Sequence, residues 1–291
     1  MPDVSVIIPV RKRPQLLKEA LASVLAGTVL PDEILVVLDG PREELQADAA
    51  AAEEMRSLCH SDTTLTLLYG PGRGPALARN IGAARARHSL LAFLDSDDLW
   101  QPHKLQEQLA YMTQRPHLHA SHCAETWLKG GTSITVPARL QPSPGRLFVE
   151  SLEHCVVSAS SVMIRRSTFF ALGGFDPTLR ACEDYDMWIR YFLRHPMGMV
   201  PPIPVPHVVK RSGQWQQLSA TRSIDRFRVQ SLYKILQTEQ LTDEQRGIVL
   251  IALKSKWNIL NAQKKKYGFP DNADYDSLEK NIEPVLKAGK E

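Results

Sequence analysis

Short apolar strands alternate with amphipathic helices through the first hundred residues of the chain. The apolar and β-branched runs at 4–8, 34–38, 65–69 and 90–94 predict buried strands. Between the first two runs, apolar residues recur every three or four positions, as expected of a helix. Strands joined by helices in this way pair in parallel and bury both of their faces. The pattern therefore predicts an α/β fold with an open sheet, which binds its ligands at the carboxyl ends of the strands.

Carboxylates follow two of these predicted strands. Asp39 comes directly after 34–38, and residues 95–98 (Asp-Ser-Asp-Asp) come directly after 90–94. Three carboxylates within four residues repel one another unless a cation or strong donors offset their charge. Mg²⁺ or Mn²⁺ would suit such oxygen ligands. The alternative is a solvated turn in which Asp97 or Asp98 caps the next helix.

A second acidic group lies at the start of a helix predicted after Cys182. It contains Glu183, Asp184 and Asp186, followed by an apolar face that includes Met187. Acidic side chains in a first turn stabilise a helix through its dipole, and this explanation needs no ligand. A catalytic role would require one of the three acids to face the edge where Asp39 and Asp95 lie. Sequence spacing does not decide between these two interpretations.

Composition restricts the classes of function. The chain has 291 residues, a hydrophobic content of 43% and a net charge of only +3, which argues against nucleic acid as a partner. Four widely spaced cysteines indicate reduced thiols in a cytoplasmic protein. We see neither a signal peptide nor a membrane-spanning run. The positive excess lies after residue 221, which suits a weak peripheral contact with the inner face of the membrane, although a solvated helix face is the simpler explanation.

The chain is predicted to divide into a main domain at 1–221 and a helical C-terminal extension at 222–291. Helical periodicity starts near Ser223, and Thr242 with Gln245 forms a predicted capping box. The apolar helices of the extension would suit a homodimer interface. Further strands are predicted at 119–126, 133–136, 156–164 and 207–210, and further helices at 45–58, 76–82, 105–112 and 167–172.

The order of four motifs resembles that of the inverting family 2 glycosyltransferases with the GT-A fold. The motifs are Val6-Ile7-Ile8-Pro9-Val10 with Arg13-Pro14; residues 33–40; residues 78–82 with 93–98; and residues 173–176 with 183–188. Together they extend over roughly residues 3–215, and their joint spacing carries the likeness. The resemblance implies a nucleotide-diphospho-sugar transferase with a Rossmann-like mixed sheet and a small C-terminal helical appendage.

The resemblance also implies a role for each matching residue. The acceptor's proton would go to Asp184 or Glu183, with Asp186 as the remaining candidate. The metal, Mg²⁺ or Mn²⁺, would be held by Asp97 and Asp95, with Asp98 supporting them. The nucleotide sugar would be bound by Pro9, Val10, Arg11, Asp39, Arg79, Asp95 and Ser96. A UDP-sugar is the expected donor. Members often have Tyr-Asn where this chain has Arg11-Lys12, and this departure leaves open which nucleotide is bound.

The resemblance further implies metal-dependent inverting transfer of a sugar from a nucleotide-diphosphate sugar to an acceptor hydroxyl. The acceptor would be a saccharide, a lipid-linked molecule or a peptide, in the synthesis of cell-surface polysaccharide or glycoconjugates. Two alternatives are a catalytically silent nucleotide-binding scaffold and a nucleotidyltransferase. The acidic pair at Glu183 and Asp184 argues against the first. The absence of a lysine- and arginine-rich phosphate loop argues against the second.

Overall fold

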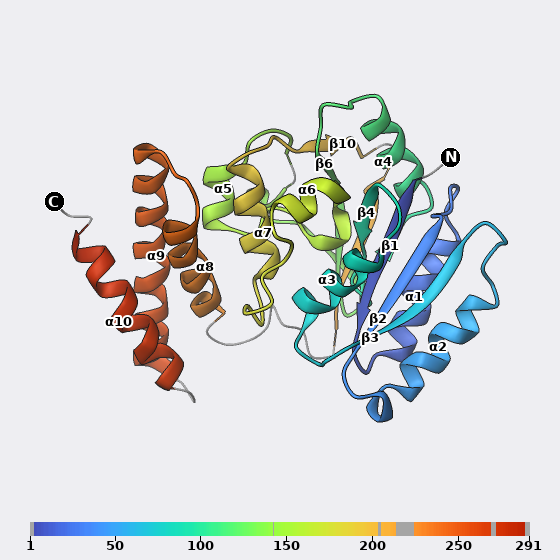
Figure 1. The fold of residues 1–291 in the computed structure, drawn as a ribbon, viewed down its shortest axis with the longest axis horizontal. Coiled ribbons are helices and arrows are strands. Elements are labelled where there is room, and N and C mark those ends of the chain that lie inside the picture. Colours follow the sequence, from blue (N-terminus) through green and yellow to red (C-terminus); the bar gives the residue numbers. More distant parts are fainter. Residues whose placement is uncertain (1–2, 142, 203–204, 214–223, 269–271, 289–291) are drawn as a thin grey trace.

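The computed structural model describes residues 3–141, 143–202, 205–213, 224–268 and 272–288. Within them, a seven-stranded sheet has the order β10-β6-β9-β4-β1-β2-β3, and a four-stranded sheet has the order β5-β11-β7-β8 (Figure 1). The strands are β1 (Val4–Val10), β2 (Glu33–Asp39), β3 (Thr64–Gly70), β4 (Leu90–Phe93), β5 (Leu99–Trp100), β6 (Ala120–Cys123), β7 (Glu125–Lys129), β8 (Thr132–Ile134), β9 (Met163–Arg165), β10 (Gly198–Val200) and β11 (Val208–Ser212).

Ten α-helices occur in the described residues. They are α1 (Pro14–Leu25), α2 (Gln46–Arg56), α3 (Pro75–Arg85), α4 (Lys104–Thr113), α5 (Phe148–Glu153), α6 (Arg166–Ala171), α7 (Glu183–Phe192), α8 (Asp225–Thr238), α9 (Asp243–Tyr267) and α10 (Asn272–Ala288). Short 3₁₀ turns lie at Arg42–Glu44, Ala138–Leu140 and Ala159–Ser161.

The large sheet is buried on both faces, as the alternation of strands and helices predicts. Ile7 of β1 packs into one apolar core, which also contains residues of α3, α5 and α7. Val6 and Ile8 point the opposite way, into a second core with residues of α1, α2 and α4. Side chains alternate along a strand, so one run of consecutive apolar residues supplies both cores.

Parallel pairing brings the ends of three strands together. In register, Ile7 of β1 lies between Leu35 of β2 and Phe93 of β4, and all three strands run in the same direction. Asp39, the last residue of β2, and residues 95–98, which follow β4, therefore lie at one edge of the sheet. The prediction of an α/β sheet with acidic residues at this edge is confirmed.

The second sheet was only partly predicted. Leu99 and Trp100, where no strand was predicted, form β5 and pair antiparallel with β11. The predicted strand at 119–126 breaks at Ala124, whose carbonyl oxygen accepts hydrogen bonds from the backbone of His207 and Val208. Its two halves, β6 and β7, therefore belong to different sheets.

The strand predicted at 156–164 is largely wrong. Its middle is the 3₁₀ turn Ala159–Ser161, and extended pairing begins only at Met163. Side chains bind the carbonyl oxygens of this turn, because Trp100 Nε1 donates to Ser160 O at 2.9 Å and Gln108 Nε2 to Ser161 O at 3.1 Å. These local hydrogen bonds replace the ladder of a strand.

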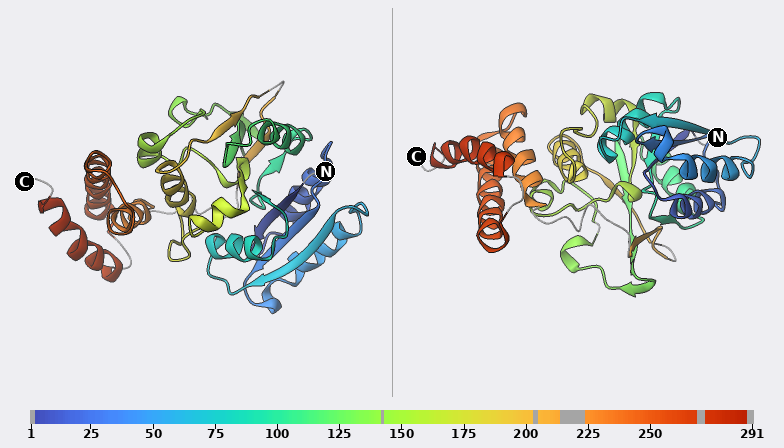
Figure 2. Two further views of the ribbon diagram at one scale, coloured as in Figure 1. Left: turned by 45° about the horizontal axis from the view of Figure 1, so that its top comes forward. Right: turned by 90° about the horizontal axis from the view of Figure 1, so that it is seen from below.

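The C-terminal helices lie at the opposite end of the molecule from β1–β3, as all views show (Figures 1 and 2). Apolar side chains of α8 and α9, such as Leu232 and Leu253, join the same core as Trp188 of α7. The capping box is present, with Gln245 N donating to Thr242 Oγ1 at 3.2 Å. The predicted boundary near residue 222 lies outside the described residues. Among the described helices, none has the length and apolar character to cross a membrane.

Helix α3 packs so closely on β1 that a methyl group would not fit at Gly82. A Cβ added there would lie 2.5 Å from Ile7 Cγ2, inside the buried core. We expect Gly82→Ala to lower the free energy of unfolding by about 1–3 kcal/mol, since overpacking forces backbone shifts. Urea unfolding monitored by circular dichroism measures this change. The matched control is Gly247→Ala on α9, where nothing lies within 4 Å of the added Cβ; its stability should stay equal or rise slightly.

Lys104 at the start of α4 is fully buried, and its ammonium lies 3.6 Å from the ring centroid of Trp100. No described residue forms a hydrogen bond with Lys104 Nζ. Burial lowers the pKa of Lys104 to about 8, so the unfolded chain binds more protons than the folded chain above that pH. The protein should therefore become more stable as the pH rises from about 8 to 10.5.

We expect Lys104→Met to be more stable than the wild type at pH 7, by up to about 3 kcal/mol. This difference should shrink toward pH 10, where the wild-type lysine loses its charge. Urea unfolding of both proteins at several pH values tests it. Lys18→Met, at a partly exposed ion pair with Glu54, should show a small difference over pH 7–9. A difference for Lys104→Met that does not change with pH would contradict the argument.

Candidate active site

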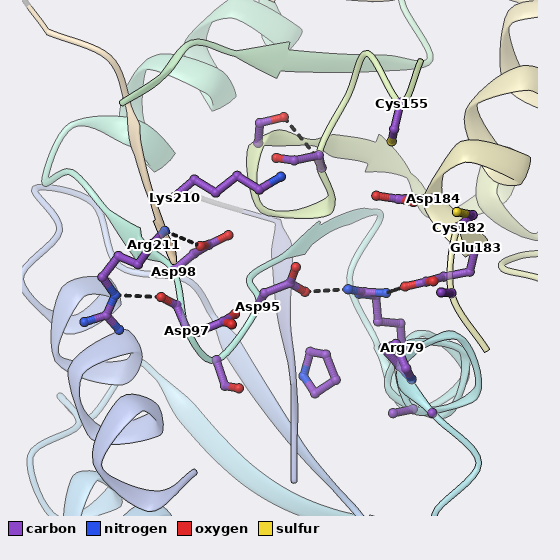
Figure 3. Close-up of a pocket in the computed structure, with 18 of the residues that line it drawn as sticks. Arg79, Asp95, Asp97, Asp98, Cys155, Cys182, Glu183, Asp184, Lys210 and Arg211 are labelled. Atoms are coloured by element: carbon purple, nitrogen blue, oxygen red, sulfur yellow. Dashed lines mark hydrogen bonds and ion pairs between the residues drawn. The ribbon is translucent and has the colours of Figure 1, made fainter. Parts of the chain in front are cut away.

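One cavity of about 710 Å³ lies at the carboxyl edge of the large sheet, and Figure 3 shows 18 of its lining residues. All but one of the candidate site residues predicted from the sequence line it: Pro9, Val10, Arg11, Asp39, Arg79, Asp95, Ser96, Asp97, Asp98, Glu183 and Asp184. Segments more than 170 residues apart in the chain thus meet around one space. Asp186 is the exception among the candidates, since it does not line the cavity.

The acidic turn after β4 is held by donors from three directions. Asp97 Oδ2 accepts from Arg13 Nη1 at 2.9 Å, and Asp95 binds Arg79. Asp98 is almost fully buried; it accepts from Ser160 Oγ at 2.7 Å and from the backbone N–H of Arg211 at 3.0 Å. Burial, together with the charge of Asp95, raises the pKa of Asp98 to about 8. Burial and like charge thus oppose ionisation of Asp98, while arginines offset the charges of Asp95 and Asp97.

Neither Asp97 nor Asp98 caps a helix, so that alternative is wrong. Helix α4 begins at Lys104, and its N-cap residue is His103. Asp98 instead fastens the two sheets together, because Ser160 precedes β9 of the large sheet and Arg211 belongs to β11 of the small one. Its role is that of a buried polar connector.

Arg79 of α3 joins the two acidic groups that the sequence singles out. Its guanidinium binds Asp95 through Nη2 and Glu183 Oε1 through Nη1, the latter at 2.7 Å, while only 3% of the residue is exposed. Figure 3 shows the guanidinium lying between the two carboxylates. The two partners raise the pKa of Arg79 above its ordinary value despite its burial. A buried positive charge therefore fixes the start of α7 against the turn after β4.

The three acids of α7 have different surroundings. Asp186 is buried and accepts from Arg190 Nη2 at 2.6 Å and from Ser231 Oγ at 2.9 Å, away from the cavity. Glu183 is buried against Arg79, and burial raises its pKa to about 7. Asp184 is half-buried at the cavity wall (Figure 3). Asp184 is thus the acid of the three with the best access to a bound molecule.

Asp39 organises the glycine-rich loop that precedes α3. Its carboxylate accepts from the backbone N–H of Gly72 at 2.8 Å and of Gly74 at 2.7 Å. Gly74 has φ = 101°, a left-handed conformation that glycine adopts without strain. These two amide groups are therefore directed to a carboxylate of the protein itself.

The carboxylates of the turn suit a hard divalent cation that shares its ligands with substrate. Asp95 and Asp97 present oxygen donors to the cavity. In the part of the chain that the structure describes, no group of three or more His, Cys, Asp or Glu side chains is arranged to hold a metal ion. Mg²⁺ and Mn²⁺ sites commonly take one or two carboxylates and complete their coordination with phosphate and water. The donor set fits that pattern and does not fit a closed structural site.

Several cavity residues escaped the sequence analysis. Lys210 and Arg211 lie on β11, and Trp127 and Glu125 lie on β7. The carboxylates of Glu125 and Asp98 raise the pKa of Lys210, although burial opposes them. The available signal was a charged side chain inside each of two short predicted strands, Glu125 in 119–126 and Lys210 in 207–210; Trp127 and Arg211 follow directly after these strands.

The model of glycosyl transferase family 2 matches residues 5–170. The chain belongs to this family. An uncharacterized glycosyltransferase of Rickettsia felis is 30% identical over 195 residues, and the amylovoran biosynthesis glycosyltransferase AmsE of Erwinia amylovora is 28% identical over 195 residues. These alignments cover 67% and 66% of this chain, and 31% and 70% of the two relatives. The chain thus spans about a third of the length of the first of them.

Solved structures share the fold of this family 2 chain. S. aureus TarS 1–349 matches with a TM-score of 0.68 at 15% identity, covering 99% of this chain and 83% of TarS 1–349. The mannosyltransferase PcManGT of Pyrobaculum calidifontis, in complex with GDP-Man and Mn²⁺, matches with a TM-score of 0.61 at 18% identity, covering 99% and 84%. The prediction of a GT-A fold with C-terminal helices is confirmed.

Removing the Arg79 guanidinium should destabilise the protein strongly. Arg79→Met leaves Glu183 buried without its partner, and we expect a loss of about 3–5 kcal/mol in the free energy of unfolding. The double variant Arg79→Met/Glu183→Gln should recover part of that loss, because the uncompensated charge is gone. Urea unfolding of the single and double variants measures this coupling.

The control for this cycle is the exposed ion pair between Lys18 and Glu54, whose carboxylate is 60% exposed. Lys18→Met should cost less than about 1 kcal/mol. Equal losses for Arg79→Met and Lys18→Met would show that the buried bridge contributes no more to stability than an exposed ion pair.

Proposed function

We propose that the chain is a metal-dependent inverting glycosyltransferase that moves a sugar from a nucleotide-diphosphate sugar to an acceptor hydroxyl. The observation that carries this proposal is the Arg79 bridge, which sets the acidic turn at 95–98 and Asp184 around one cavity. A cavity of about 710 Å³ is within the range of small-molecule and cofactor sites. The acidic turn would serve the leaving diphosphate, and Asp184 would serve the attacking hydroxyl.

The proposed donor is a UDP-sugar, bound along the ends of β1 and β2 by Pro9, Val10, Arg11, Asp39, Arg79, Asp95 and Ser96. Support comes from the related fold of TarS 1–349, solved in complex with UDP-GlcNAc. Mg²⁺ or Mn²⁺ would be held by Asp95 and Asp97 and would supply positive charge to the diphosphate as it leaves. PcManGT, solved in complex with GDP-Man and Mn²⁺, supports this assignment by fold similarity.

Asp184 is proposed as the general base. The acceptor oxygen forms a bond to the anomeric carbon, and the bond from that carbon to the β-phosphate oxygen breaks with its electron pair going to the diphosphate. The acceptor's proton passes to the Asp184 carboxylate. Attack from the face opposite the diphosphate inverts the anomeric centre. Glu183 would act by holding Arg79 rather than by taking the proton, since it is buried in the bridge.

The proposed setting is the synthesis of cell-surface polysaccharide or glycoconjugates, for which the amylovoran biosynthesis relative gives support. The four cysteines are free thiols, which suits the reducing conditions of the cytoplasm. A peripheral contact with the inner face of the membrane would bring the active site to lipid-linked molecules.

Asp97→Ala and Asp184→Asn should each lower donor turnover, but in different ways. Asp184→Asn should reduce kcat by about 10²–10⁴-fold because it removes the base, while the donor and Mn²⁺ still raise the Tm. Asp97→Ala should also remove most of that increase in Tm, since it removes a metal ligand. Release of nucleoside diphosphate and thermal unfolding with UDP-glucose, UDP-galactose, UDP-GlcNAc and GDP-mannose measure both effects.

Asp62→Asn is the control, because Asp62 is exposed and remote from the cavity. It should keep both turnover and donor-induced stabilisation. Unchanged turnover in Asp97→Ala and Asp184→Asn would refute the assignment of roles. Donor stabilisation without turnover across acceptors would instead favour a catalytically silent nucleotide-binding protein.

A further inference from the structure

The small sheet presents an aromatic and two charged side chains to the cavity. Strands β7 and β11 pair in parallel with Trp127 directly opposite Lys210. Glu125 lies two residues before Trp127 on the same strand and therefore on the same face. All three side chains line the cavity. The roles proposed for the acidic turn and for Asp184 do not explain why these three side chains face the cavity.

Hydrogen bonds fix the positions of Trp127 and Glu125. Trp127 Nε1 donates to Glu125 Oε2 at 2.9 Å, and Ser158 Oγ donates to Glu125 Oε1. Trp127 is half-buried, so its position is set while part of its ring still faces the cavity. An aromatic ring held in this way is a rigid surface, which loses little conformational entropy when a ligand packs on it.

Lys210 completes the group with hydrogen-bond donors. Its ammonium lies 5.8 Å from the ring centroid of Trp127. In the described part of the chain no side chain forms a hydrogen bond or ion pair with that ammonium, although Glu125, Asp98 and Asp184 supply negative charge around it. Figure 3 shows Lys210 reaching into the cavity on the side where Asp184 lies. Its donors are therefore available next to the proposed base.

This combination matches the surface of a sugar ring. A pyranose has a C–H face that packs against an aromatic ring, and hydroxyl groups at its rim that need both donors and acceptors. Trp127 offers the ring, Glu125 an acceptor and Lys210 donors, and hydrogen bonds to charged groups are the stronger ones. A lipid chain would gain nothing from the two charges, which would lose hydration without being paired.

We infer that Trp127, Glu125 and Lys210 form the acceptor subsite and that the acceptor is a saccharide. This inference rests on the proposed function, which requires an acceptor hydroxyl beside Asp184. A sugar ring packed on Trp127, with its rim bound by Lys210, would have a hydroxyl on the Asp184 side of the cavity. Trp127 and Lys210 are then binding residues that determine acceptor specificity.

The first test measures binding without turnover. The full chain is titrated with octyl glucoside, octyl galactoside, octyl mannoside and octyl N-acetylglucosaminide below their micellar concentrations, and intrinsic tryptophan fluorescence is recorded. At least one glycoside should change the fluorescence of the wild type, and Trp127→Phe should lose most of that change. Tyr267→Ala, an exposed aromatic at the end of α9, is the control and should behave as the wild type.

The second test separates acceptor from donor. With the glycoside that binds and the nucleotide sugar that stabilises the wild type most, Trp127→Ala should raise the KM for the glycoside at least about tenfold. Lys210→Met should do the same. The increase in Tm caused by the nucleotide sugar and Mn²⁺ should persist in Trp127→Ala, which also shows that this variant folds.

Two results would overturn the inference. If Trp127→Ala abolished donor-induced stabilisation, the ring would pack against the nucleobase instead. If no glycoside changed fluorescence or turnover, while a serine- and threonine-containing peptide or a polyprenyl phosphate supported turnover, the acceptor would not be a saccharide. A wild type that neither binds nor turns over any nucleotide sugar would contradict the proposed function itself. The fluorescence titration would then still decide whether Trp127 binds saccharides.

Discussion

A single buried guanidinium holds the two halves of the site in place. Arg79 lies on α3, its partners lie after β4 and at the start of α7, and almost none of its surface contacts solvent. A charge buried in this way is costly unless its partners are present. The three segments that carry Arg79 and its two partners therefore stabilise one another. The position of Asp184 relative to the acidic turn is thus a consequence of ion pairing in the interior.

The parts of this arrangement that follow from local sequence were predictable. Consecutive apolar residues mark β1, β2 and β4, and parallel pairing then requires Asp39 and Asp95 to share an edge. The acids of α7 were also visible as a group, but their separation into one buried partner of Arg79, one partner of Arg190 and one cavity residue was not. That separation depends on the direction of each side chain in the packed helix.

The small sheet was predicted only in part, for a different reason. Its strand β5 has two residues and pairs with residues more than a hundred positions later. Such a strand is too short to show a periodic pattern, and its pairing is stabilised by long-range contacts rather than by local propensity. Asp98 shows the same difficulty, because its position after a strand suits a helix cap while its partners, Ser160 and Arg211, are distant in the chain.

The connection through Asp98 bears on how new specificities can arise in such a fold. One side chain fastens the small sheet to the large one, and it does so through the backbone of β11 and a serine next to β9. Among the cavity-facing side chains, Glu125 and Arg211 add to that attachment by binding Ser158 and the backbone oxygen of Asp97, respectively. In the described residues, the side chains of Trp127 and Lys210 form no hydrogen bond of this kind. These two can vary by mutation, in nature or in the laboratory, while the sheet that carries them keeps its place. The fold thereby separates Asp98, which must stay constant, from cavity-facing side chains that can change.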